Sequence, residues 1–390
     1  MGSHFAPGST ASLRTANQQR VLDVLRDPSP VDGGVVTMSQ ADLARVTGLA
    51  PATVSNIVRE LLAGGLVDVE PGSGRRGTSV RLARSAGLVA GIDFGHSHVA
   101  VALGDLAGTL LAHAREELDP DARHDASMDL AARLLASLSA SAHTPASAVR
   151  SLAVGLPAPI SEGVVRSSAI LPGWVGVNAQ RAVERRFGMV AHIENDANLG
   201  ALAEHRHGIA RGHQTSVFLK VSSGIGAGLI IDGRLFHGSA GTAGEIGHLT
   251  LDEQGPVCRC GSRGCLEAYA STTAIRTMMA TQLPDARLDD VIQAAQTGNV
   301  SALRTFEDAG LHLGWGLASI VNLLNPSVVV VGGDLVRAGD LLLDSVRIGL
   351  RRHALDAVAG TPVLVSELGE QASLLGAVLL AAERTDLLAV

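Results

Sequence analysis

The amino-acid sequence predicts an α/β protein with two similar lobes that follow a small helix-turn-helix domain. Three observations lead to this fold class. Residues 17–62 carry helical hydrophobic spacing around a glycine turn, and a buried strand that ends in a glycine-rich turn occurs twice, at 88–97 and 216–228. The length of 390 residues is sufficient for two or three domains.

The net charge of −7 is unevenly distributed along the chain. Residues 1–84 hold nine arginines and seven acidic residues, whereas the remainder holds 22 basic and 31 acidic residues. A mildly basic head on an acidic body is compatible with nucleic acid bound at the head alone. We find no apolar stretch of about 18 residues and no signal peptide, and the three cysteines lack a disulfide pattern. We therefore expect a cytoplasmic protein with no membrane partner.

Residues 1–84 are predicted to form a winged helix-turn-helix domain. A helical pattern over 17–26 is followed by a helix that Ser39 caps and, after a glycine turn, by a helix that Pro51 opens. The predicted buried face of this third helix comprises Val54, Ile57, Val58, Leu61 and Leu62. The opposite face, which we expect to enter the major groove, presents Thr53, Ser55, Asn56 and Arg59. Asn56 has the chemistry to read adenine, and Arg59 to bind guanine or phosphate; a plain solvated face is the alternative.

A hairpin with strands at 66–69 and 78–82 is expected to form the wing. Its tip carries Arg75 and Arg76 between glycines, which suits contact with phosphate or with the minor groove. A loop tip without DNA contact is the alternative. The order helix, turn, helix and wing favours a DNA-binding domain.

Each lobe is predicted to open with a buried strand, a glycine-rich turn and a hairpin. The turn residues are Asp93, Gly95 and Ser97 in the first lobe and Gly224, Gly226 and Gly228 in the second. Backbone N–H groups in such turns can bind phosphate, so two turns in corresponding places suggest a nucleotide between the halves. Gly332 and Gly333 end a further buried strand, where adenosine would lie, although glycines that simply end a parallel strand are an equal alternative.

Four metal-ligating side chains lie close together in the second lobe. His248, Cys258, Cys260 and Cys265 have the spacing His-x9-Cys-x-Cys-x4-Cys, and the three thiols are the only cysteines of the chain. A closed set of four nitrogen and sulfur ligands is typical of a structural zinc site. Unrelated buried thiols are the alternative, and a disulfide would leave one thiol over.

Together these stretches resemble the ROK family (repressor, open reading frame, kinase), which groups sugar-responsive transcription factors with ATP-dependent sugar kinases. The most specific match is the run from Gly241 to Tyr269. The resemblance implies an actin-like (ribonuclease H-like) two-lobed sugar kinase fold behind the winged helix-turn-helix. Residues 88–200 and the C-terminal helix at 372–390 would form the smaller lobe. Residues 201–371 would form the larger lobe, with the zinc site and a dimerisation surface.

The resemblance also implies which residues meet ligands. Zinc would be bound by His248, Cys258, Cys260 and Cys265. Sugar hydroxyls would be met by Asn195, Asp196, Glu245, His248 and Glu267, with Ser168 and Gly155 lining the pocket. A helix cap is an alternative role for Asp196. Ile170 stands where the family usually has asparagine, which puts the usual sugar preference in doubt.

The first phosphate turn bears on whether the chain is a kinase. Family kinases read Asp-x-Gly-Gly-Thr there, whereas this chain places His96 at the second glycine. Asp196, the proton acceptor that a kinase would need, is present. We therefore expect a sugar-responsive DNA-binding regulator, with vestigial phosphate turns and no enzymatic activity. It would repress genes of carbohydrate uptake or catabolism and bind operator DNA as a homodimer or homotetramer.

Two alternatives follow from the same residues. The chain could be an active ATP-dependent hexokinase with a DNA-binding head, or a sugar-binding protein whose head contacts another protein.

Overall fold

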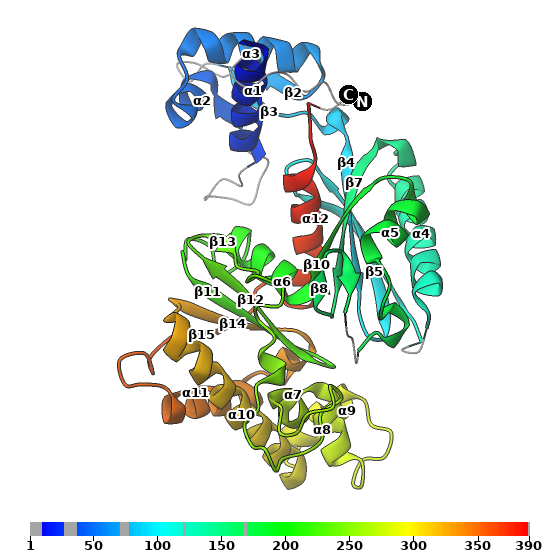
Figure 1. The fold of residues 1–390 in the computed structure, drawn as a ribbon, viewed down its shortest axis with the longest axis vertical. Coiled ribbons are helices and arrows are strands. Elements are labelled where there is room, and N and C mark those ends of the chain that lie inside the picture. The colour runs from blue at the N-terminus through cyan, green and yellow to red at the C-terminus, as the bar shows by residue number, and fades with distance from the viewer. Residues whose placement is uncertain (1–9, 27–36, 71–77, 120–121, 167–169, 389–390) are drawn as a thin grey trace.

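The computed structural model describes residues 10–26, 37–70, 78–119, 122–166 and 170–388. Figure 1 shows a small helical head above two lobes, each built around one sheet. No helix in the described ranges is long and apolar enough to cross a membrane.

The described residues of the head form three helices and a small sheet of order β1-β3-β2. The elements are α1 (Thr10–Arg26), β1 (Met38–Ser39), α2 (Gln40–Thr47), α3 (Pro51–Ala63), β2 (Val67–Glu70) and β3 (Ser79–Leu82). The Ser39 side chain accepts a hydrogen bond from the amide of Asp42, and Gly48 ends α2 at φ 69°, so both predicted helix signals are confirmed. Leu62 was predicted to be buried but is 47% exposed, at the C-terminal end of α3 and outside the buried set of that helix.

The smaller lobe contains a five-stranded sheet of order β10-β7-β4-β5-β6. Its strands are β4 (Leu88–Phe94), β5 (His98–Asp105), β6 (Leu110–Glu117), β7 (Val149–Leu156) and β10 (Val190–Asn195). Alternate residues of β4 face opposite sides. Ile92 packs with α4 (His124–Ser141) and α5 (Ala179–Phe187). Val89 packs with α6 (Asp196–Arg206) and α12 (Ala372–Arg384).

The larger lobe repeats this topology, with the strand order β13-β12-β11-β14-β15. Its strands are β11 (Ser216–Val221), β12 (Ile225–Ile231), β13 (Arg234–Leu235), β14 (Val328–Gly332) and β15 (Val363–Val365). In both sheets the first strand pairs antiparallel with the next strand and parallel with a later one. The predicted duplication of the lobes is therefore confirmed.

Five helices of the described residues share one hydrophobic core with the second sheet. They are α7 (Leu266–Ala270), α8 (Thr272–Met279), α9 (Leu288–Gln296), α10 (Val300–Leu324) and α11 (Asp340–His353). Short strands β8 (Ile160–Ser161) and β9 (Val164–Val165) form a hairpin in the smaller lobe. Helix α6 lies between the lobes, since Leu199 packs in the core below the first sheet and Ala201 packs against the second.

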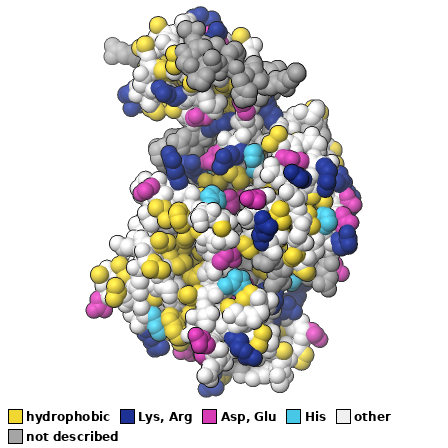
Figure 2. Space-filling view, in the orientation of Figure 1, with side chains coloured by type: hydrophobic (Ala, Val, Ile, Leu, Met, Phe, Trp, Pro, Cys, Tyr) yellow, Lys and Arg dark blue, Asp and Glu magenta, His cyan; other side chains and the backbone are white. Residues whose placement is uncertain are grey.

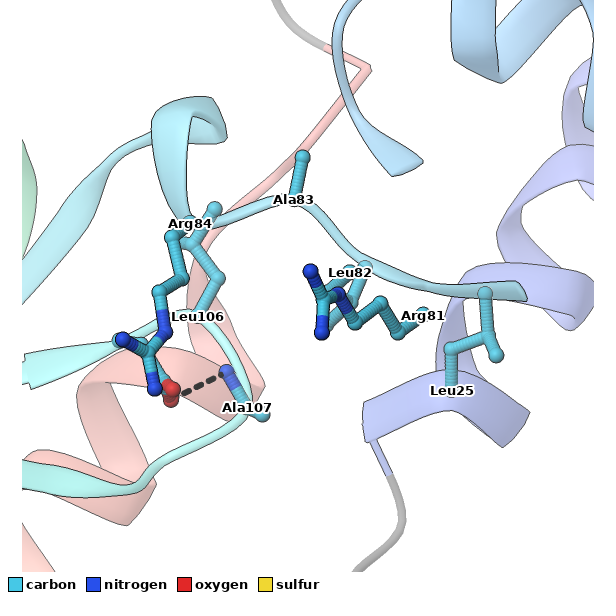
Figure 3. A pocket seen from close by; sticks show the side chains of 8 residues that line it. Leu25, Arg81, Leu82, Ala83, Arg84, Leu106 and Ala107 are labelled. Atoms are coloured by element: carbon cyan, nitrogen blue, oxygen red, sulfur yellow. Dashed lines mark hydrogen bonds between the residues drawn. The ribbon is translucent and has the colours of Figure 1, made fainter. Parts of the chain in front are cut away.

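The head shares a continuous core with the smaller lobe. Leu22 and Leu25 of α1 belong to the same buried cluster as Leu379 and Leu387 at the C-terminal end of the chain. Figure 3 shows Leu25 beside the segment from Arg81 to Arg84 that leads from the head into the smaller lobe. The head is therefore packed against the body through apolar contacts.

Candidate ligand cleft and metal cluster

The N-terminus of α6 places polar side chains between the two lobes. The Asn195 side chain is the cap, accepting hydrogen bonds from the amides of Ala197 at 2.8 Å and Asn198 at 3.2 Å. The alternative role of Asp196 as a helix cap falls to Asn195 instead, because Asp196 is already the first helical residue. The buried Asp196 carboxylate instead accepts a hydrogen bond of 2.7 Å from Lys220.

Lys220 was not predicted to be part of the site. It lies in β11, and its Nζ also donates to Oγ of Ser373 at 3.0 Å. Burial lowers the pKa of Lys220, but Asp196 and Asp93 raise it well above its ordinary value. The signal in the sequence was a single lysine inside an otherwise apolar strand.

The first glycine turn is occupied by a histidine side chain. The ring of His98 lies against Gly95, and a Cβ placed on that glycine would clash with it. His98 Nε2 is 3.4 Å from Oδ2 of Asp93, and the carbonyl of Ser97 accepts a bond from Leu118. His96, which was expected to crowd the turn, instead places Nδ1 3.0 Å from the carbonyl oxygen of Ile170.

The second glycine turn is shorter than predicted. Strand β12 begins at Ile225, so Gly226 and Gly228 are strand residues that pair with Lys220 and Phe218. A glycine in a strand permits close approach, and here Gly228 faces Ala197 and Ala201 of α6. Gly224 remains in the turn, with the side chain of Ile170 directly against it.

The third turn follows β14. Gly332 is the last residue of that strand, and Gly333 has φ 87°, a value that favours glycine. The next amide, of Asp334, donates a hydrogen bond of 3.1 Å to Oγ of Ser222 in the second turn. The second and third turns are therefore joined at the same edge of the larger sheet.

Two glutamates of the larger lobe lie near the N-terminus of α6. Glu267 is buried, and its Oε2 accepts a hydrogen bond of 3.1 Å from the amide of Ile225. Burial, together with the charges of Asp196 and Glu267, raises the pKa of Glu245 to about 7. Glu245, Asp196 and Glu267 therefore share one electrostatic environment.

The predicted metal ligands come together in space. One ligand atom from each of His248, Cys258, Cys260 and Cys265 lies within 4.8 Å of all the others. The Cys260 and Cys265 sulfurs are 3.7 Å apart, and Cys258 Sγ is 3.9 Å from His248 Nδ1. With Zn–S bonds of about 2.3 Å, the sulfur–sulfur edge of a tetrahedron is about 3.8 Å. These four side chains can therefore hold a tetrahedral metal ion.

Two of the four α3 side chains that were predicted to contact DNA are exposed. Asn56 and Arg59 are exposed and hydrogen-bonded to each other at 3.1 Å, whereas Thr53 and Ser55 are half-buried. Arg75, Arg76 and Ser168 lie outside the described residues.

Comparison with known proteins identifies the family. Residues 89–384 match the ROK family. The chain belongs to the ROK family. Residues 15–77 match the MarR family, so the ROK body carries a MarR-like winged helix-turn-helix at its N-terminus.

Several relatives match almost the whole chain. The chain is 29% identical to the xylose repressor of Bacillus spizizenii, over 93% of this chain and 94% of the relative. It is 30% identical to the transcriptional dual regulator NagC of Escherichia coli, over 96% and 94% of the two chains. A ROK family transcriptional regulator described as a homologue of the Escherichia coli MLC protein superposes with a TM-score of 0.77. That alignment has 26% identity and covers 96% of this chain and 98% of the other. The predicted fold class is therefore confirmed.

Proposed function

We propose that this ROK protein is a sugar-responsive DNA-binding repressor of genes for carbohydrate uptake or catabolism. The observation that carries the proposal is a winged helix-turn-helix joined to a ROK body in one chain. Relatives that match more than nine-tenths of the chain are named xylose repressor and N-acetylglucosamine repressor. Operator DNA would bind the head, residues 1–84, and the effector sugar would bind between the smaller lobe (88–200 and 372–390) and the larger lobe (201–371).

The sugar pocket is proposed to lie at the N-terminus of α6. Sugar hydroxyls need hydrogen-bonding groups held in fixed positions. The proposed contacts are Asn195, Asp196, Glu245, His248 and Glu267, with Gly155 beside Asp196. Ser168, the remaining predicted residue, lies outside the described residues. The polar groups around Asp196 and Glu245 support this location, and the apolar Ile170 side chain at Gly224 would favour a different set of sugars from that of relatives with asparagine there.

A structural zinc ion is proposed at His248, Cys258, Cys260 and Cys265. The fit of their ligand atoms to one tetrahedron supports it, and four protein ligands leave no open position for catalysis. His248 faces the cluster with Nδ1, so Nε2 would be available to a sugar hydroxyl. When bound, zinc would contribute folding free energy to the loop that carries Glu245 and Glu267.

Helix α12 is proposed to transmit the sugar signal to the head. At its N-terminal end Ser373 Oγ donates to the carbonyl of Asp196 at 2.8 Å and accepts from Lys220. At its C-terminal end the carbonyl of Thr385 accepts a hydrogen bond from Arg26 of α1. Figure 1 shows α12, in red, running from the middle of the molecule to the head. A shift of α6 on sugar binding would therefore move α12 and, through it, α1.

The protein is proposed to act as a homodimer or homotetramer through the larger lobe. Figure 2 shows hydrophobic side chains gathered on the left side of this lobe. The large apolar side chains exposed on α10 and in the segment that follows α11 include Trp315, Leu323 and Leu355, of which Leu323 is 83% exposed. A symmetric dimer would place two heads on two half-sites about 34–36 Å apart. Leu323→Glu should lower the mass measured by light scattering.

The experiment that tests the proposed function is a thermal-shift screen of the full chain against a sugar panel. A ligand at 100 times its dissociation constant adds about 2.7 kcal/mol of stability, so the effector should raise the unfolding midpoint clearly. The active hexokinase remains the alternative because Asp196 is retained. Sugar-dependent ADP release from MgATP at more than about one per second, lost in Asp196→Asn, would favour the kinase.

A further inference from the structure

Lys220 is the only lysine of the chain, and its position is unusual for a charged residue. It lies in β11, whose other residues are buried, and its own side chain is 18% exposed. A buried ammonium is unfavourable unless it is paired with opposite charge. Its partners, the Asp196 carboxylate and Ser373 Oγ, come from two different helices.

A second buried carboxylate lies beside this pair. A Cβ placed on Gly155 would be 3.1 Å from Oδ1 of Asp93 and 3.8 Å from Cα of Asp196, so the two aspartates flank the same point of β7. Within the described part of the chain, Asp93 Oδ1 is buried and has no hydrogen-bond partner. Burial raises the pKa of Asp93, but the charge of Lys220 and the neighbouring His98 and Arg115 outweigh it and hold the pKa at about 2. Asp93 is therefore an ionised carboxylate.

Two neighbouring buried carboxylates resemble the surroundings of a catalytic cation. Mg²⁺ in phosphoryl-transfer enzymes is commonly held by one or two carboxylates together with the substrate phosphates. Here the positive charge that balances both carboxylates belongs to the protein itself. A divalent cation beside the Lys220 ammonium would face like-charge repulsion. In addition, Oδ2 of Asp196 already accepts a hydrogen bond from Lys220.

We propose that Lys220 is a specificity-determining residue whose ammonium replaces a divalent cation between Asp93 and Asp196, so that the cleft binds a neutral sugar and excludes MgATP. This inference rests on the sugar cleft of the proposed function. His98 also disfavours the binding of MgATP. Its ring lies against Gly95, where a phosphate would have to approach the turn.

The test measures Mn²⁺ binding to the full chain by electron paramagnetic resonance. Lys220→Met removes the charge while keeping much of the side-chain volume, and Lys220→Arg is the matched control that keeps the charge. We expect Lys220→Met to bind Mn²⁺ at least tenfold more tightly than the wild type, and the gain to be lost in Lys220→Met/Asp93→Asn. The Arg variant should behave as the wild type. Addition of a non-hydrolysable ATP analogue should strengthen Mn²⁺ binding in the Met variant only.

Lys220→Gln, which is uncharged but polar, replaces the Met variant if the latter does not fold. Failure of the folded neutral variant to gain Mn²⁺ overturns the proposal, as does wild-type Mn²⁺ binding that Asp93→Asn abolishes. The sugar panel is run on the same samples. A gain of Mn²⁺ without any sugar response would refute the sugar-responsive function but would still support the exclusion of a divalent cation by Lys220.

Discussion

Arg26, the last residue of α1, donates a hydrogen bond of 2.5 Å from its guanidinium to the main-chain carbonyl of Thr385, which follows α12. The bond is buried, and the two residues are 359 positions apart in sequence. Thr385 Oγ1 is also 2.6 Å from Oγ of Ser151 in β7. Hydrogen bonds therefore join the DNA-binding head to the end of α12 and, through Thr385, to β7. The other end of α12 contacts Asp196.

Arg26→Ala should uncouple DNA binding by the head from sugar binding by the body. The variant loses the buried link between α1 and the end of α12, whereas the residues of the cleft are untouched. We expect sugar affinity within about twofold of the wild type and a loss of most of a coupling free energy that is typically about 1–3 kcal/mol. Fluorescence anisotropy of labelled operator with and without sugar measures this. Arg20→Ala is the control, because Arg20 contacts the carbonyl of Thr47 within the head alone. Equal coupling in both variants would contradict the proposed role of α12.

Removal of zinc should loosen the metal loop and weaken sugar binding. A structural zinc ion stabilises the fold that surrounds it, so chelation should increase amide hydrogen exchange over residues 241–270. Metal analysis should find one zinc per chain, and Cys258→Ser should reduce it. Unchanged sugar affinity in a zinc-free protein would contradict the proposed site.

Asn195→Ala should weaken both stability and sugar binding. The lost cap of α6 lowers the free energy of unfolding by about 1 kcal/mol. Asn178→Ala provides a matched control, because Asn178 caps α5 through the amide of Arg181 at 2.9 Å. Calorimetric titration with the effector should show a loss for the Asn195 variant only. A similar loss in both variants would indicate a purely structural role for Asn195.

Arg59→Ala should weaken operator binding. An arginine that contacts a guanine or a phosphate contributes about 1–3 kcal/mol, and the loss should be sequence-dependent if a base is read. Arg45→Ala on α2 is the control, since Arg45 is similarly exposed but pairs with Asp42 at 3.0 Å. Anisotropy titrations at two salt concentrations separate base contacts from phosphate contacts.

The His237–Glu194 pair should stabilise the fold in a pH-dependent way. His237 Nε2 is 2.8 Å from Oε2 of Glu194, and this hydrogen bond raises the pKa of His237 above 6.5 despite partial burial. For Glu194, burial acts to raise the pKa, but His237 and Asn198 lower it below 4.5. The pair therefore stabilises the fold most between pH 4.5 and pH 6.5, the ordinary pKa values of the two side chains. The stabilisation is lost as pH rises through the pKa of folded His237. His237→Gln should lower the unfolding midpoint at pH 6 and have a smaller effect at pH 8.5.

The sequence predicted the elements that local patterns determine. Ser39, Pro51 and the repeated glycine turns located helices and the duplicated lobes, because capping and hydrophobic periodicity act over a few residues. The four side chains that could hold a metal ion were predicted by spacing alone, since three of them lie within eight residues of chain.

Contacts between distant segments could not be predicted in this way. Lys220 stood out as a single lysine, but nothing local indicated its pairing with Asp196 and Ser373. The same is true of the bond between Arg26 and Thr385. The sequence left open whether Asp196 caps α6, because Asn195 and Asp196 are equally good capping types and only backbone geometry assigns the cap to Asn195.

Operator binding measured as a function of sugar tests the central claim most directly. DNA selected by the full chain from a random pool serves as operator, and its affinity is measured by anisotropy against each sugar that stabilises the protein. We predict that at least one such sugar changes the dissociation constant for DNA by about fivefold or more, and that Asp196→Asn removes the response. Unchanged DNA affinity with every sugar that binds the protein would contradict the account.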